Sequence, residues 1–174
     1  MKIKNNYKIK NENGFSLIEL MVVVAILGII ILGLVTFFTG GTKSWVAGQS
    51  QLEAQRNARQ AMDRMVKEIR EADYINSSSV SSQIDFNTPF DGSISYSLSE
   101  SGDLKRGFNL IINNVQSLAF TYFDNSDTAV DLPLTVETAS KISKVHIDLK
   151  VDVDDDGNPD ITLNTDVSLR NFGL

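Results

Sequence analysis

The sequence of 174 residues contains no cysteine and a single histidine. Without cysteine the chain can form neither a disulfide framework nor a thiolate metal site, so a domain outside the cytoplasm would depend on its packed core alone. The sequence also has no G-x-S-x-G element and no glycine-rich phosphate-binding loop. Two carboxylates on the fold would still suffice for glycoside hydrolysis, but these absences favour a protein that is not an enzyme.

Basic residues are scarce in the distal part of the chain. The formal net charge is −6, but residues 1–14 alone sum to +3, whereas residues 75–174 carry six basic against fifteen acidic side chains. Nucleic-acid affinity comes largely from lysine and arginine side chains that displace phosphate counterions. We therefore expect no direct binding of nucleic acid by this chain.

Charge is nearly absent from residues 15–38, where Glu19 is the only ionisable side chain. A helix of about 20 apolar residues crosses a bilayer core, and the lysines of residues 1–14 predict a cytoplasmic N-terminus. A secretory signal peptide or a simple membrane anchor are the ordinary interpretations. Against a signal peptide, the apolar run is long, it contains a carboxylate at its fifth residue, and no small-x-small cleavage signal follows it.

The segment GFSLIELMVVVAILGII, which begins at Gly14, resembles the N-terminal signature of the type IV prepilin family, including the pseudopilins of type II secretion. The resemblance implies that prepilin peptidase, a membrane aspartic peptidase, cuts on the cytoplasmic side between Gly14 and Phe15 and methylates the new terminus at Phe15. It also identifies Glu19 as the glutamate of that family. Mature subunits would join other pilin subunits in a helical filament, with the help of an inner-membrane assembly platform.

Physical chemistry gives each of these residues a reason. Gly14 lacks a side chain, so its backbone can enter a protease cleft in an extended form. A carboxylate in hydrocarbon is costly unless it is protonated or paired. The natural partner of Glu19 is the terminal ammonium of Phe15 on a neighbouring subunit. The alternative is a carboxylate that lies near the membrane interface and extends toward water.

The helix should continue beyond the membrane to Tyr74. Many family members have a proline midway through this helix, whereas this chain has Thr36 and the pair Gly40 and Gly41. Because glycine weakens a helix by about 1 kcal/mol relative to alanine, we expect local melting or a bend near the two glycines. Beyond them, apolar or small residues recur at helical spacing and predict a core-facing stripe, with three i,i+4 charge pairs on the other faces. The stripe consists of Ala58, Met62, Met65, Ile69 and Ala72; the pairs are Asp63–Lys67, Arg64–Glu68 and Lys67–Glu71.

The last hundred residues read as strands. Short strands are expected over residues 83–87 and 93–98, separated by the turn-rich link TPFDG. Residues 103–124, with LKRGF followed by NNVQSLAFTYFD, are similar to minor pilins and pseudopilins of the J or W type. Strict alternation of apolar and polar residues over 145–153 and 161–169 predicts an antiparallel hairpin packed on the helix stripe. His146 falls on its polar face, as a solvated strand residue.

An acidic loop, DVDDDGNPD, separates the two strands of this hairpin. Its spacing matches the start of an EF-hand calcium loop and also resembles the DxDxDGxxD loops of thrombospondin-type repeats. The twelfth position, however, holds Leu163 rather than a bidentate glutamate. An ordinary turn would use the same aspartate, glycine, asparagine and proline residues. Candidate calcium ligands are Asp152, Asp154, Asp156, Asn158 and Asp160.

The sequence thus predicts an α+β pilin fold, in which one long N-terminal helix packs on an antiparallel β-sheet. We expect a cytoplasmic leader over residues 1–14, a transmembrane and filament-core helix over 15–38, its amphipathic half over 39–74, and an extracytoplasmic β-rich domain over 75–174. The expected function is a structural minor subunit of a type IV pilus, type II secretion or DNA-uptake filament. The alternative is a membrane-tethered domain that binds a ligand or calcium and does not polymerise.

Overall fold

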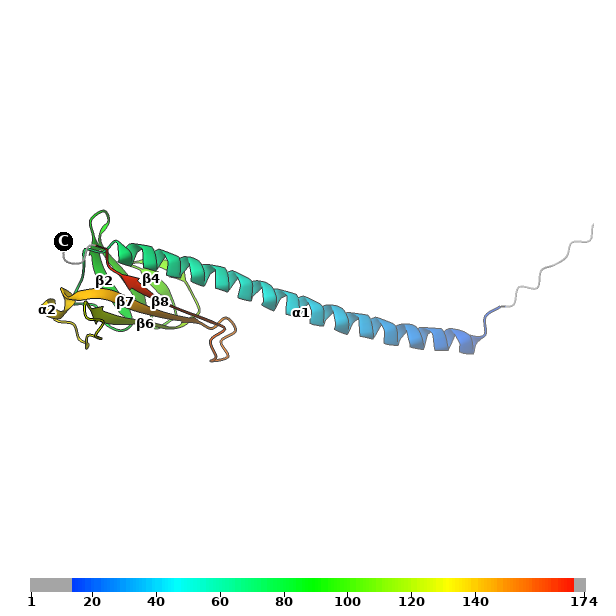
Figure 1. Cartoon of the computed structure of the whole chain (residues 1–174). Helices are drawn as coiled ribbons and strands as arrows, with labels where there is room; N and C mark the ends of the chain where they lie inside the picture. Colours follow the sequence, from blue (N-terminus) through cyan, green and yellow to red (C-terminus); the bar gives the residue numbers. More distant parts are fainter. Residues whose placement is uncertain (1–13, 171–174) are drawn as a thin grey trace, which may run out of the picture. The chain divides into compact units, whose positions relative to one another are not determined.

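A computed structural model describes residues 14–170 of the chain. It confirms the α+β class: a long helix, α1 (Leu17–Arg70), and a short one, α2 (Val136–Ala139), accompany eight strands in two antiparallel sheets (Figure 1). The chain divides into two compact units between Val46 and Ala47, so the first part of α1 belongs to one unit and the rest of the helix to the other.

The first unit contains the apolar part of α1. This is the one helix within the described residues that is long and apolar enough to cross a membrane, and none of its most apolar stretch is buried. The melting expected at Gly40 and Gly41 is wrong, because both lie inside the uninterrupted α1. A cost of about 1 kcal/mol per glycine is too small to interrupt a helix that is hydrogen-bonded on both sides. Three nearby threonines also bond their hydroxyls to carbonyl oxygens of the preceding turn: Thr36 to Leu32, Thr39 to Val35 and Thr42 to Phe38.

The second unit begins with the amphipathic part of α1. All five residues of the predicted stripe are buried, as is Ala61 beside them. The helix ends at Arg70 rather than at Tyr74. Asp73 donates its backbone N–H to the Asn87 carbonyl at 2.8 Å, and the chain then forms a short strand, β1 (Tyr74–Ile75). From Asp73 onward, the backbone therefore forms hydrogen bonds with the neighbouring strand instead of continuing the helix.

The first sheet has five strands in chain order, each antiparallel to its neighbour. The predicted strands appear as β2 (Gln83–Thr88) and β3 (Gly92–Leu98), and Ile84 and Phe86 alternate inward as a half-buried sheet requires. The sheet is completed by β4 (Leu104–Arg106) and β5 (Asn109–Ile112).

The second sheet has three strands in the order β6 (Val115–Asp124), β7 (Ile142–Val151), β8 (Ile161–Ser168). The predicted hairpin is therefore confirmed as β7 and β8, with Ile147 opposite Thr165. In β6, Leu118, Phe120 and Tyr122 are buried on one face. The strands form two sheets rather than the single sheet expected.

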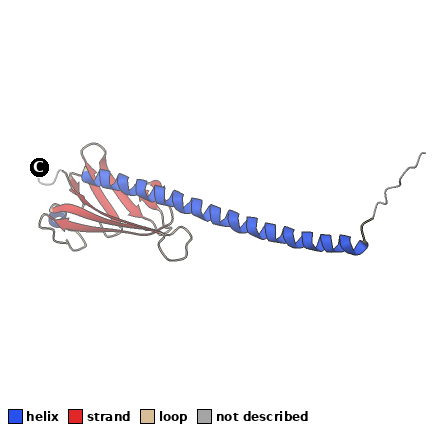
Figure 2. Ribbon diagram, turned by 45° about the vertical axis from the view of Figure 1, so that its right-hand side comes forward, coloured by secondary structure: helices blue, strands red, loops and turns tan. Residues whose placement is uncertain are grey.

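One hydrophobic cluster joins the second part of α1 to both sheets, and Figure 2 shows the strands of this unit beside that part of the helix. Met65, Ile69, Phe86, Phe120 and Ile147 are among its most deeply buried side chains. The end of the described chain closes the unit, because Arg170 donates its backbone N–H to the carbonyl of Arg70 at 2.9 Å. The last turn of α1 thus obtains a partner that its own helix cannot supply.

Candidate functional site

The segment expected to be processed is open. Gly14, Phe15 and Ser16 precede α1 without regular structure, and Phe15 is 82% exposed. A Cβ atom at Gly14 would meet nothing within 4 Å, so packing within this chain does not require glycine there. The leader expected over residues 1–14 lies outside the described residues except for Gly14.

Glu19 lies in the first turn of α1 and is exposed. A carboxylate there interacts favourably with the N-terminal end of the helix dipole. Among residues 14–170 the structure records no hydrogen bond or ion pair of the Glu19 side chain. Its carboxylate is therefore presented outward, four residues from Phe15 along the chain.

The apolar surface that follows Glu19 is bare on all sides of the helix. Leu32 is 71% exposed and Phe37 is 75% exposed, and the large apolar residues between Leu20 and Val35 are at least half exposed. Fully burying one such side chain is worth about 1.5–3 kcal/mol. Residues 14–170 offer these side chains no cover, so water is not their natural surrounding.

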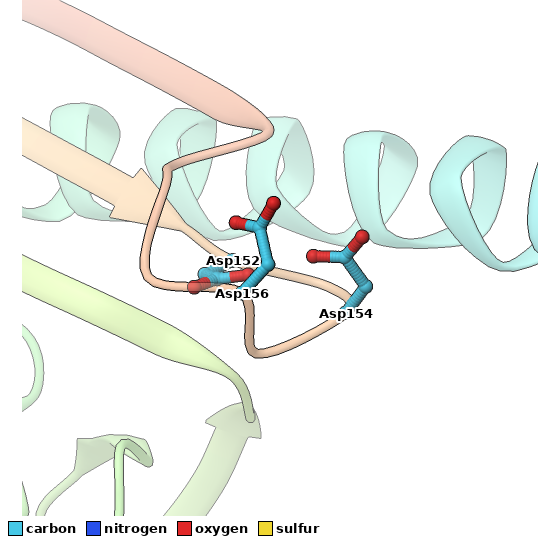
Figure 3. Close-up of side chains that lie close together, drawn as sticks. All are labelled: Asp152, Asp154 and Asp156. Atoms are coloured by element: carbon cyan, nitrogen blue, oxygen red, sulfur yellow. The ribbon is translucent and has the colours of Figure 1, made fainter.

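The acidic loop joins β7 to β8, and it brings three of the five candidate ligands together (Figure 3). One carboxylate oxygen from each of Asp152, Asp154 and Asp156 lies within 4.8 Å of the other two. Partial desolvation and the charges of Asp156 and Asp160 raise the pKa of the Asp154 carboxyl above its ordinary value. The loop thus concentrates negative charge, and no cationic side chain of the described residues lies among the three carboxylates.

Asp152 differs from its two neighbours because it is only 7% exposed. Its Oδ2 accepts the backbone N–H of Gly157 at 2.9 Å. Its Oδ1 is buried and has no hydrogen-bond partner within the described chain. A buried oxygen left unpaired costs about 1–3 kcal/mol, and more when it is charged.

The other two candidate ligands act in the loop itself. Asp160 accepts the backbone N–H of Val153 at 2.8 Å through Oδ2, and its Oδ1 lies 3.4 Å from Nε2 of Gln51 on α1. Asn158 donates its backbone N–H to Oδ1 of Asp156 at 2.7 Å. Asp160 therefore braces the loop, and Asn158 contributes a backbone contact.

A polar cluster that we did not predict connects α1 to the first sheet. Oε2 of Glu68 accepts the Tyr96 hydroxyl at 2.7 Å and Nε of Arg106 at 2.9 Å, while Oε1 accepts Nε of Arg64 at 3.0 Å. Burial raises the pKa of Glu68, but the hydrogen bonds from Arg106, Tyr96 and Arg64 outweigh it and hold the pKa below its ordinary value. The i,i+4 spacing of Arg64 and Glu68 was the only sequence signal of this cluster.

His146 lies in β7 with its side chain 36% exposed, and its Nδ1 is 2.6 Å from a carboxylate oxygen of Asp166 in β8. The two residues face each other directly across the hairpin. This position confirms the predicted polar face. The pair has the geometry of an ordinary cross-strand contact.

Comparison with known families agrees with the N-terminal geometry. Residues 9–35 match the model of the prokaryotic N-terminal methylation motif. No curated protein matches the chain. The matched residues include the open Gly14–Phe15 segment, Glu19 and most of the bare apolar helix, which together fit a membrane-anchored chain. The match, which covers only this N-terminal segment, supports a type IV pilin-like processed subunit.

Proposed function

We propose that this chain is a minor subunit of a type IV pilus, type II secretion or DNA-uptake filament. Prepilin peptidase cuts it after Gly14 and methylates Phe15, and the mature chain enters a helical filament from the cytoplasmic membrane through an inner-membrane assembly platform. Its N-terminus is cytoplasmic and its β-rich unit is extracytoplasmic. The observation that carries the proposal is the motif matched over residues 9–35, together with the uncovered apolar surface of the α1 residues within it.

An uncovered apolar helix suits both the membrane-inserted state and the filament state of such a subunit. In the membrane, lipid surrounds the apolar side chains; in a filament, the helices of neighbouring subunits replace the lipid. The apolar side chains are surrounded by apolar groups both in the membrane and in the filament, so the hydrophobic effect contributes little to the transfer. Van der Waals packing and polar contacts therefore decide the association. A subunit of this kind needs at least one polar contact to set its register.

Glu19 supplies that contact in our proposal. Cleavage creates an ammonium group on Phe15, four residues before Glu19. Along one chain the two groups lie close to the N-terminal end of α1, so the carboxylate of one subunit can meet the ammonium of the next when their helices are offset. Pairing removes the cost of an isolated carboxylate in hydrocarbon, which is about 2.5–3.5 kcal/mol or more at the bilayer centre.

The minor role rests on the resemblance to the J or W type. The residues that carry it lie in β4, which contains Arg106, and in β6, which contains Leu118 and Tyr122. Quantitative mass spectrometry of purified filaments tests this point. We expect far fewer copies of this chain than of the major subunit, and equal abundance would contradict the minor role.

Processing is tested by mass spectrometry of the chain isolated from the membrane fraction of its host. We expect a terminus at N-methylated Phe15. An intact Met1 terminus would contradict processing and favour the second interpretation, a membrane-tethered binding domain that never polymerises. The acidic loop, with its three gathered carboxylates, is the feature that favours this alternative.

Assembly is tested with the Glu19→Ala variant. We expect it to be cleaved and methylated normally but to be lost from filaments, and Glu19→Gln should behave similarly because the amide keeps the size and removes the charge. Glu53→Ala is the matched control, since Glu53 is an exposed acid of the same helix beyond the apolar run. Normal incorporation of both Glu19 variants would overturn the pairing.

A further inference from the structure

The β7–β8 loop holds a metal-binding geometry that membrane anchoring and filament assembly do not need. Two oxygens bound to one calcium ion at about 2.3–2.6 Å can be no more than about 5.2 Å apart. The oxygens of Asp152, Asp154 and Asp156 all lie within 4.8 Å of one another. One ion placed among the three oxygens therefore needs only small side-chain movements to reach calcium-ligand distances from all of them.

A second observation is independent of the cluster of charges. Asp152 is more than nine-tenths buried, and its Oδ1 has no hydrogen-bond donor in the described chain. Natural folds seldom leave a buried carboxylate oxygen unpaired. Figure 3 shows the carboxylate of Asp152 beside those of Asp154 and Asp156, so a cation bound among the three lies next to the side chain that carries the unpaired oxygen.

The loop is already held in a binding shape. Gly157 has φ +87°, a conformation that favours glycine, and its N–H orients the Asp152 carboxylate through Oδ2. From β6, Gln116 donates Nε2 to the Gly157 carbonyl at 2.7 Å. Asn114 provides a carbonyl for the N–H of Asp152 at 3.0 Å. The loop and the Asp152 carboxylate are thus held in place by hydrogen bonds within the loop and to residues 114 and 116.

We propose that this loop binds one calcium ion through Asp152, Asp154 and Asp156, with Asp152 as the buried central ligand. The donor set is oxygen alone, which suits hard cations such as calcium and magnesium. Magnesium requires near-ideal octahedral geometry, whereas calcium accepts the irregular arrangement of a turn. Backbone carbonyls and water complete the coordination.

The affinity should be modest. Leu163 occupies the position of the bidentate glutamate in a complete EF-hand loop. We therefore expect a Kd of about 0.1–1 mM, the range of extracellular calcium modules. Such a site fills outside the cell and stays empty at the low free calcium of a cytoplasm.

The bound ion has a structural consequence. The loop contacts α1 through Asp160 and Gln51 and contacts β6 through Gln116. Calcium neutralises the mutual repulsion of the three aspartates and so stabilises the hairpin at the point where it meets the helix. The β-rich unit becomes more stable once it encounters millimolar calcium.

The test uses the full-length chain in detergent micelles, stripped with a chelator and titrated with calcium chloride by isothermal calorimetry and by thermal unfolding. We expect one ion per chain, and a rise in Tm of about 5 °C at ten times the Kd. Magnesium at the same concentration should give a clearly smaller rise. Absence of binding heat and of a Tm shift at calcium well above 1 mM would overturn the proposal and leave an ordinary turn.

Two variants in the same loop distinguish calcium binding at a defined site from nonspecific attraction of calcium to the acidic residues of the loop. Asp154→Asn should weaken calcium binding at least tenfold while the stripped chain unfolds near the wild-type temperature, because Asp154 is exposed. Asp155→Asn is the matched control: it removes an equal charge from an exposed residue outside the cluster, and its φ of 58° suits asparagine. Equal losses of affinity in the two variants would contradict a defined site.

Discussion

Replacing Glu68 should destabilise the β-rich unit strongly, because three donors converge on one partly buried carboxylate. The side chain is 14% exposed, and the Tyr96 residue whose hydroxyl it accepts is fully buried. In Glu68→Ala this hydroxyl is left unpaired, at a cost of about 1–3 kcal/mol. Arg106 remains partly exposed to solvent and lies 3.4 Å from Asp91, so removing its contact with Glu68 costs less free energy. The exposed ion pair of Arg64 with Glu68 contributes about 0.3–0.5 kcal/mol. We expect a total of about 2–5 kcal/mol.

A double-mutant cycle isolates the central hydrogen bond. Glu68→Gln keeps the size of the side chain, and Tyr96→Phe removes only the hydroxyl. We expect a coupling energy of about 1–2 kcal/mol between them, since charge-assisted hydrogen bonds are stronger than neutral ones. Urea unfolding of the full-length chain in mild detergent, followed by near-ultraviolet circular dichroism of the remaining tyrosines, measures it.

The same variants predict a pH dependence. The folded chain holds the pKa of Glu68 below its ordinary value of 4.5. A carboxyl with a lowered folded pKa adds stability above the unfolded pKa, and this stability is lost as the pH falls through the folded pKa. The stability difference between wild type and Glu68→Gln should therefore shrink on acidification below about pH 4.5.

The control for this experiment is Asp63→Ala, an exposed acid on the same helix, which should stay within about 0.5 kcal/mol of wild type. Additive effects of Glu68→Gln and Tyr96→Phe, with a coupling below about 0.3 kcal/mol, would refute the reasoning. A loss in Asp63→Ala as large as in Glu68→Ala would indicate that general helix charge, rather than the cluster, is responsible.

Two further predictions concern the core. Burial raises the pKa of Tyr96 and Tyr122 well above the ordinary value, so both stay protonated in the folded chain. Because unfolding then releases protons, the free energy of unfolding should fall as the pH rises above about 10. Urea unfolding at several pH values measures this dependence. Tyr122→Phe should reduce the slope of unfolding free energy against pH, and an unchanged slope would contradict the prediction. Met65→Ala should cost about 2–5 kcal/mol because Met65 is fully buried; a thermal scan against exposed Gln60→Ala measures it, and equal Tm values would contradict the assigned core.

Local patterns predicted the elements of this fold well. The 3.6-residue repeat placed Met62, Met65 and Ile69 in the core, and strict alternation identified β7 and β8. The division into two sheets could not be read from the same patterns. Strand partners depend on contacts between distant residues, and alternation says which face is buried without saying which strand lies beside it.

In the candidate sites too, contacts between residues close in sequence were predicted, and contacts between residues far apart in sequence were not. Spacing alone brought Asp152, Asp154 and Asp156 together, because all three belong to one turn. The burial of Asp152 depends on packing that the local sequence does not encode. Glu68 was expected to pair with Arg64 on an outer face, but its other partners come from strands 28 and 38 residues away. Charge pairs within one helix therefore do not reveal which faces are solvated.

If the β-rich unit is exported as proposed, the hydrogen bond between Arg170 and Arg70 has a consequence for the order of events during export. The helix segment before Arg70 shares its core with β8, which is nearly a hundred residues later in the chain. Contacts of such long sequence separation form slowly, because a large loop must close first. A chain that is threaded through a translocation channel from its N-terminal side therefore cannot complete this unit until its final strand has emerged. In the proposed function, this topology therefore delays folding of the unit until its export is complete.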